Sequence, residues 1–366
     1  MVDEIQIVDF KALEAFGQRV FCALGVPAED ALWTSQVLVR ADLRGIESHG
    51  VGRIRRYVSG IQKGLIAPRA RMKIVHETPV SALLDAENGL GQVAGRRAMQ
   101  IAMEKAIQRG TGWVAVRNSN HFGIAGCYSM MALERDLIGF STTNSHGYVI
   151  PTFGKEPILG TNPLSVAIPA GAERPFVLDM STAVVTSGRL EVYHREGKKI
   201  PLGWAVDERG LPCDDPGRIL ANLKGHRGGG ILPLGGEGED YGGHKGYGLD
   251  AWADIFSGVL SGSGYLNTLY PKDKEGREMP SRVGHFFGAW RIDLFRPVEE
   301  FKRDMDDFIR RLRQSTKAEG QDRIYVHGEK EFELEEKHRQ MGIPLSKKVY
   351  GELRAIAEEL KIPWDL

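Results

Sequence analysis

Cysteine is scarce in this sequence, and the few cysteines do not form pairs. Among 366 residues there are only Cys22, Cys127 and Cys213, with no CxxC motif and no Cys/His pair at metal-ligand spacing. Widely spaced cysteines in odd number do not build a disulfide framework and are typical of a reducing compartment. The sequence therefore predicts a cytoplasmic protein without a metal site.

Excess charge and long apolar runs are missing as well. Lys and Arg total 48, as do Asp and Glu, so the formal net charge is zero and no basic surplus is available for a phosphate backbone. No segment reaches the ~18 apolar residues of a membrane span. Residues 1–16 carry acids where a secretory signal carries bases. We therefore expect neither nucleic acid nor a membrane as a partner.

The motifs of common hydrolases are absent too, since the sequence has neither HExxH nor GxSxG. Ser48 adjoins His49, but side chains that are neighbours at a helix start are not expected to point at each other. A Ser-His-Asp hydrolase stays open as an alternative, because such triads are defined by geometry and not by order in the sequence.

Helical and strand-like segments are both present. Helical periodicity covers seven main stretches: 9–24, 29–44, 51–63, 89–110, 298–314, 330–341 and 347–360. Between them, apolar runs such as WVAVRN, IGFSTTN, LSVAIP, FVLDMS and HFFGAWRIDLF read as strands, with shorter helices over 122–136, 188–196 and 247–260. Strands that alternate with helices predict an α/β or α+β fold with a mixed sheet.

The stretch RGIESHGVGRIRRYV, residues 44–58, places three chemically active side chains at regular spacing. His49, Arg53 and Tyr57 are four residues apart, which on an α-helix puts an imidazole, a guanidinium and a phenol on one face. The alternative is an exposed basic helix.

Polar side chains also gather where predicted strands end. His121 follows WVAVRNSN at a position that favours anionic or carbonyl ligands, and Asn144 and His146 end the next strand. Asp179 comes directly after an apolar run and therefore needs a partner. Each cluster taken alone is also compatible with an ordinary polar turn.

Glycine is over-represented, with 45 residues, and two glycine-rich stretches stand out. Gly89, Gly91 and Gly95 nearly spell the dinucleotide fingerprint, but the last spacing is one residue too long. We interpret them as a turn that starts a helix. In residues 232–252, Lys245 precedes a helix and is a candidate anion contact, although Gly246 rules out a P-loop.

Six segments together resemble a known family: SHGVGRIRRY, SNHFGIAG, LGTNPLSVAIPA, LDMSTAVVTSGRLE, IPLGWAVDERGLP and GGHKGYGL. Their order and spacing are similar to the malate/L-lactate dehydrogenase family of NAD(P)-dependent oxidoreductases, which lacks a Rossmann fold. The resemblance runs from about Phe10 to GEKEFELEEKHRQMGIPL. It implies a cofactor-binding mixed-sheet domain over 118–296. It also implies a largely helical substrate and dimerisation domain over 1–117 with 297–366.

The resemblance also implies roles for individual residues. Ser48 and His49 match a pair at the reacting carbon, and His121 matches a proton acceptor that also lies by the cofactor. Which histidine is the acid/base stays open. The substrate contacts expected are Arg53, Tyr57 and Asn144. The cofactor contacts expected are Asn144, Asp179, Met180, Ser181, Lys245, Gly328 and Glu329. Departures from the family pattern are His244, His327 and a longer stretch over 223–243.

The expected activity is hydride transfer between a small 2-hydroxy acid and NAD or NADP, with NAD favoured and (S)-malate as the first choice. Lactate, sulfolactate and ureidoglycolate are alternative substrates, and reduction of a cyclic imine carboxylate is an alternative reaction. A binding protein without catalysis is the alternative from another class. We expect a homodimer.

Overall fold

A mixed seven-stranded sheet forms the centre of the structure, a computed structural model that describes residues 5–366. The strands, in spatial order, are β2 (Lys73–Glu77), β3 (Ser81–Asp85), β4 (Thr111–Ser119), β10 (Val283–Arg291), β5 (Leu137–Thr143), β6 (Leu164–Ile168) and β7 (Phe176–Met180). Only β3 and β4 run parallel, and the other neighbours are antiparallel. The predicted fold class is therefore confirmed.

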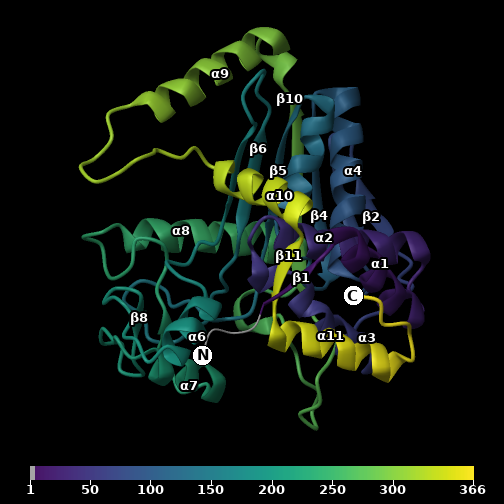
Figure 1. The fold of residues 1–366 in the computed structure, drawn as a ribbon, viewed down its shortest axis with the longest axis vertical. Coiled ribbons are helices and arrows are strands. Elements are labelled where there is room, and N and C mark those ends of the chain that lie inside the picture. Colours follow the sequence, from purple (N-terminus) through teal and green to yellow (C-terminus); the bar gives the residue numbers. More distant parts are fainter. Residues whose placement is uncertain (1–4) are drawn as a thin grey trace.

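Both faces of the sheet are covered (Figure 1). Because side chains alternate along a strand, the neighbours Phe286 and Phe287 on β10 enter different cores. On one face, α2 (Ala28–Leu43) and α4 (Gly91–Arg109) pack against Phe287. On the other, Phe286 meets Trp252 of α8 (Gly243–Asp254) and the π-helical turn η4 (Ile255–Val259) that follows.

A helical lobe lies beside the sheet and joins distant parts of the sequence. Its helices are α1 (Phe10–Ala23), α2, α3 (Ile54–Gln62) and α11 (Lys347–Leu360). Strand β1 (Ile5–Val8) pairs antiparallel with β11 (Ile343–Ser346), and Figure 1 shows these two strands side by side above α11. The apolar stripe of α1, formed by Leu13, Phe16 and Val20, is fully buried in this lobe.

The remaining elements are short or lie at the periphery. They are α5 (Gly126–Ser129), α6 (Ser187–Arg195), β8 (Ala205–Val206), α7 (Pro216–Gly225), β9 (Gly230–Ile231), α9 (Val298–Gln314), α10 (Glu329–Met341) and the 3-10 turns η1 (Glu47–His49), η2 (Val51–Arg53), η3 (Met130–Arg135), η5 (Leu266–Thr268) and η6 (Ile292–Leu294). No helix among residues 5–366 has the length and apolarity needed to cross a membrane.

Two helices expected from the sequence need correction. The predicted helix over 122–136 is only α5 followed by a 3-10 turn. The helix over 51–63 begins at Ile54, after the separate turn η2. The predicted domain boundary between 117 and 118 falls inside β4, and β2 and β3 already belong to the sheet, because β3 pairs with β4. The division into two domains itself stays a prediction.

Candidate active site

Two histidines from distant segments stack on each other. His49 ends the turn η1, and His121 follows β4 in the loop before α5. Their ring centroids lie 5.4 Å apart with an interplanar angle of 22°. The hydroxyl of Tyr57, on α3, lies 2.6 Å from Nδ1 of His121. The structure thus brings together three residues that the sequence predicted for one site.

The route by which they meet differs from the prediction. His49, Arg53 and Tyr57 do not share a face of one α-helix, since the chain breaks into two 3-10 turns before α3. At the break, Gly50 lies against the carboxyl of Asp42 and has no room for a side chain. Oδ2 of Asp42 accepts the N–H of Val51 at 2.7 Å, which fixes the break in place. A buried side chain therefore overrides the helical spacing.

Ser48 supports His49 directly. Its Oγ lies 2.9 Å from Nδ1 of His49, and its carbonyl accepts Nε–H of Arg53 at 2.6 Å. The expectation that Ser48 and His49 would not point at each other is wrong, because a 3-10 turn places consecutive side chains differently from an α-helix. The contact engages one ring nitrogen of His49 and leaves the other for a ligand.

Burial keeps both imidazoles neutral at pH 7. It lowers the pKa of His49 to about 4, and the positive charges of Arg53 and Arg56 act in the same direction. Burial, followed by the charge of Arg56, lowers the pKa of His121 well below its ordinary value. Burial also raises the pKa of Tyr57 to about 12, so its hydroxyl stays protonated. Neutral imidazoles accept a proton from an alcohol, which suits acid/base chemistry.

Two guanidiniums lie at the same site without an acidic partner. Among the described residues, Arg53 and Arg56 make no ion pair, and Arg56 only donates to the hydroxyl of Tyr270 at 3.2 Å. Arg55, between them, pairs with Glu359 on α11. The unpaired cations provide a binding place for anions such as carboxylates. Arg56 is not among the site residues predicted from the sequence, where its only signal is the position next to Tyr57.

Residues predicted to bind the cofactor line a separate cavity of about 250 Å³. Asp179 at the end of β7 and Gly328, which precedes α10, both face it, together with Tyr325 and Lys330. Oδ2 of Asp179 accepts the N–H of Gly126 at 2.8 Å, and burial raises the pKa of this carboxyl to about 6. A carboxylate, an ammonium and an aromatic face fit the hydroxyl, phosphate and ring groups of a dinucleotide.

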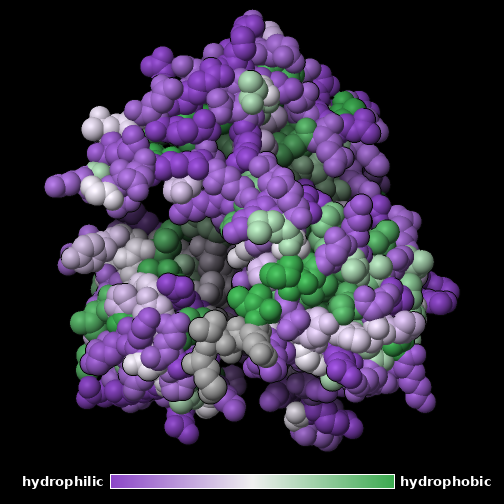
Figure 2. Space-filling view, in the orientation of Figure 1, coloured by the Kyte–Doolittle hydropathy of each residue, from purple (hydrophilic) through white to green (hydrophobic). Residues whose placement is uncertain are grey.

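The predicted cofactor residues Met180, Ser181 and Lys245 are not part of the lining of this cavity. Met180 and Ser181 follow Asp179, and Oγ of Ser181 donates to the carbonyl of Thr161 at 2.9 Å. Lys245 is exposed in the first turn of α8 and has no carboxylate partner in the described part of the chain. Figure 2 shows a hollow in the surface between α8 and α10. Lys245 lies in the first turn of α8, and Gly328 directly precedes α10.

Two residues predicted to contact ligands, Glu329 and Asn144, have side chains that are already hydrogen-bonded within the protein. The carboxylate of the buried Glu329 binds Arg313, Arg323 and the N–H of Val326. The amide of Asn144, also buried, donates to Asp254 at 2.8 Å and accepts the N–H of Gly284 at 3.0 Å. Both side chains hold neighbouring segments together, and direct ligand contacts for them stay predictions.

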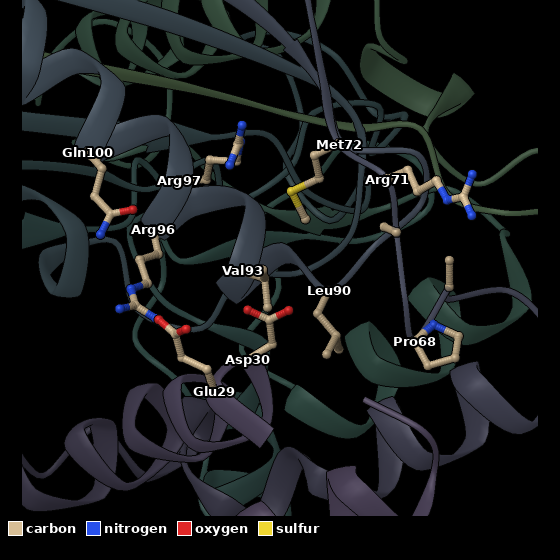
Figure 3. A pocket seen from close by; sticks show the side chains of 12 residues that line it. Glu29, Asp30, Pro68, Arg71, Met72, Leu90, Val93, Arg96, Arg97 and Gln100 are labelled. Atoms are coloured by element: carbon tan, nitrogen blue, oxygen red, sulfur yellow. The ribbon is translucent and has the colours of Figure 1, made fainter. Parts of the chain in front are cut away.

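A larger cavity of about 440 Å³ lies at the start of α4 and contains none of the predicted site residues (Figure 3). Leu90 and Val93 belong to its apolar lining, and the carboxyl of Asp30 points toward them. Arg96 turns away to pair with Glu29 at 2.9 Å. Cavity size alone therefore does not locate the histidine site. The Gly89–Gly95 stretch forms the start of α4, as interpreted from the sequence.

Comparisons with known proteins show similarity to dehydrogenases. The family model for malate/L-lactate dehydrogenase matches residues 8–354. The chain is 48% identical to a malate dehydrogenase from Pyrococcus abyssi over 96% of this chain and 94% of that protein. It is 40% identical to an L-sulfolactate dehydrogenase from Methanocaldococcus jannaschii, over 92% of each.

Among solved structures, a malate dehydrogenase from Entamoeba histolytica has a TM-score of 0.93 at 38% identity, over 99% of this chain and 100% of the other. Sequence and fold therefore agree along almost the whole length. The chain belongs to the malate/L-lactate dehydrogenase family of oxidoreductases, which transfer a hydride between a 2-hydroxy acid and a nicotinamide cofactor.

Proposed function

We propose that this chain is a malate dehydrogenase that interconverts (S)-malate and oxaloacetate. The observation that carries the proposal is the pair of unpaired guanidiniums, Arg53 and Arg56, beside the neutral pair His49 and His121. Malate has two carboxylates, and two guanidiniums suit it better than lactate, which has one. The similarity to the malate dehydrogenase of Pyrococcus abyssi supports the same substrate.

Each residue of the site has a separate role in the proposed reaction. A nicotinamide cofactor, when bound, accepts the hydride from the hydroxyl-bearing carbon or returns it. The alcohol proton passes to a neutral imidazole, His49 or His121, and comes back from it in the reduction. Arg53 and Arg56 hold the carboxylates and so fix which face of the substrate is presented. Ser48 orients His49, and Tyr57 orients His121.

We favour NAD over NADP as the cofactor. In the 250 Å³ cavity, the carboxylate of Asp179 accepts hydrogen bonds from ribose hydroxyls but repels an additional phosphate. Arg44 also lines this cavity, but its guanidinium is buried and already pairs with Glu335 at 3.0 Å. Lys330, which lines the cavity, and the exposed Lys245 are our candidate cations for the pyrophosphate.

We also propose a cytoplasmic homodimer. The dimer is supported by apolar side chains exposed on η4 and directly after it: Ile255, Val259 and Leu260 are each more than 50% exposed. Contiguous apolar surface of this kind marks association sites. Among the described residues Cys22, Cys127 and Cys213 are all free thiols, which supports a reducing location.

A sulfolactate dehydrogenase is the second candidate, because a sulfonate and a carboxylate also make two anions and a relative at 40% identity carries that name. The test is a screen of oxaloacetate, 3-sulfopyruvate and pyruvate against NADH and NADPH. We expect oxaloacetate with NADH to give the highest kcat/KM, and pyruvate to be at least roughly tenfold poorer, about 1.4 kcal/mol. A preference for 3-sulfopyruvate selects the second candidate, and a preference for pyruvate contradicts both.

A further inference from the structure

A third histidine near the site, His146, is not used by the roles given above. It lies in the loop after β5, and its side chain is exposed. Within residues 5–366 neither of its ring nitrogens has a hydrogen-bond partner, whereas His49 and His121 each have one at Nδ1. The imidazole of His146 is therefore available to hydrogen-bond a ligand.

The backbone on both sides of His146 is fixed by hydrogen bonds. Before it, the N–H of Ser145 donates to Oδ1 of Asn162 at 2.8 Å. After it, the N–H of Tyr148 donates to the carbonyl of Leu159 at 2.8 Å. The loop therefore presents the imidazole from a defined position.

Two tyrosine rings hold the imidazole of His146 in edge contacts. Its ring centroid lies 5.0 Å from that of Tyr148, with an interplanar angle of 70°. The centroid of the Tyr270 ring is 5.3 Å away, at an angle of 83°. T-shaped contacts between rings are stabilising, and here they leave both ring nitrogens of His146 without a hydrogen bond.

Tyr270 connects His146 with the arginines of the site. Its hydroxyl accepts a hydrogen bond from Nη2 of Arg56 at 3.2 Å. Arg53 instead donates to the carbonyl of Ser48, whose hydroxyl contacts the first of the two stacked histidines. The two guanidiniums are thus anchored in different places, with Arg53 beside the stacked histidines and Arg56 on the side of Tyr270 and His146.

A 2-oxo acid with a second acid group needs two anion contacts at different distances from the reacting carbon. The carboxylate next to that carbon fits Arg53, and the distal group fits Arg56. We propose, on the basis of the proposed function, that His146 is a specificity-determining residue that donates a ring N–H to the distal acid group, alongside Arg56. In either protonation state an imidazole has at least one N–H to donate. A substrate without a distal acid group gains nothing from it.

The test compares two variants of the full protein by their kcat/KM for oxaloacetate, 3-sulfopyruvate and pyruvate with NADH. His146→Phe keeps a ring for the edge contacts but has no N–H, and His146→Gln keeps an N–H donor. We expect His146→Phe to lower kcat/KM about ten- to hundredfold for the two diacids and less than about twofold for pyruvate. His146→Gln should restore part of the loss. His76→Phe, on the exposed strand β2, is the matched control and should change none of the three values.

Two kinetic outcomes contradict this role of His146. An equal loss for all three oxo acids in His146→Phe marks a structural role, and unchanged values for the two diacids mark no role. Either result overturns the proposal.

A binding measurement makes the test independent of turnover. Succinate and propionate differ only in the distal carboxylate, and both lack the hydroxyl that hydride transfer requires. In the NADH complex of protein labelled with ¹⁵N-histidine, we expect succinate but not propionate to shift the signal of His146, which is identified by its loss in His146→Phe. A signal that succinate leaves unchanged, or that both acids shift equally, overturns the proposal. If the wild type reduces no oxo acid while succinate alone shifts the signal, the proposed function fails and the His146 contact stands.

Discussion

At the scale of single residues, the neutral state of the histidines has the most direct consequence. His121→Ala removes the imidazole that Tyr57 orients, and we expect kcat to fall ~10²–10⁴-fold while the Kd for NADH stays nearly constant. His76→Ala, on the exposed strand β2, is the control and should be silent. Steady-state kinetics of His49→Ala, measured in parallel, decide which histidine is the acid/base. If His121→Ala keeps near-normal turnover and His49→Ala is inactive, the acid/base role belongs to His49.

Arg53 tests the carboxylate clamp. Arg53→Lys keeps the charge but loses the planar fork and the bond to the Ser48 carbonyl. We expect KM for the oxo acid to rise and kcat/KM to fall by about 2–4 kcal/mol in free energy, with the affinity for NADH unaffected. Arg55→Lys makes the same change at a residue paired with Glu359, away from the histidines, and should leave kinetics unchanged. Weaker NADH binding in Arg53→Lys with normal KM would make Arg53 a phosphate contact.

Asp179 predicts how cofactor binding depends on pH. Burial raises the pKa of its carboxyl to about 6, so the group is charged above that pH and protonated below it. The charged form is the stronger acceptor for ribose hydroxyls, and the Kd for NADH should therefore increase as the pH falls from 7.5 to 5. Fluorescence titration measures this. In Asp179→Asn the Kd should be higher at pH 7.5 and lack that pH dependence; retention of the wild-type pH dependence would contradict the assignment.

How much of the site the sequence predicted depends on the kind of residue. His49, Arg53, Tyr57 and His121 stood out because imidazoles, guanidiniums and phenols carry chemistry and recur in a family pattern. Gln92 had no such signal, since its amide becomes informative only in the structure, where it is buried with no hydrogen-bond partner among residues 5–366. Glu329 is the opposite case: the sequence predicted it as a cofactor contact, but in the structure its carboxylate binds two arginines.

At the scale of elements, long helices with clear periodicity were predicted almost to the residue, as for α9 and α11. The strands β1 and β11 were not, because each has four residues and is stabilised by a partner more than 330 positions away. The start of α3 was also predicted wrongly because of a residue distant in sequence. The buried carboxyl of Asp42 accepts the N–H of Val51 and so breaks the helical segment predicted over 51–63.

The first turn of α4 gives a prediction at this scale. Gly91→Ala adds a methyl group against the carbonyls of Asn120 and His121, so we expect a loss of about 1–3 kcal/mol in the free energy of unfolding and displacement of His121, with reduced kcat. Gly351→Ala, inside α11 with open space around it, should instead stabilise by about 0.5–1 kcal/mol. Denaturant unfolding measures both, and equal stability of the two variants would contradict the close packing at Gly91.

At the scale of the whole molecule, the exposed apolar side chains after α8 predict self-association. We expect sedimentation to show a dimer, and Val259→Asp to weaken it because a charge is then buried in the interface. Leu202→Asp, at another exposed apolar residue, is the control. An active monomer of the wild type at assay concentration would refute the dimer, and a dimer that persists in Val259→Asp would place the interface on a different face.

The pairing of β1 with β11 also has a consequence for biosynthesis. The central sheet is contained within residues 73–291 and can form while the ribosome is still adding residues. The helical lobe that carries Tyr57 cannot form at that stage. Its helix α3 packs against α11, and β1 pairs with residues 343–346, which are synthesised later. During translation β1 and α3 therefore remain without these packing partners and are a natural place for chaperones to bind. We therefore expect catalytic competence only after α11 has been synthesised and has packed against α3.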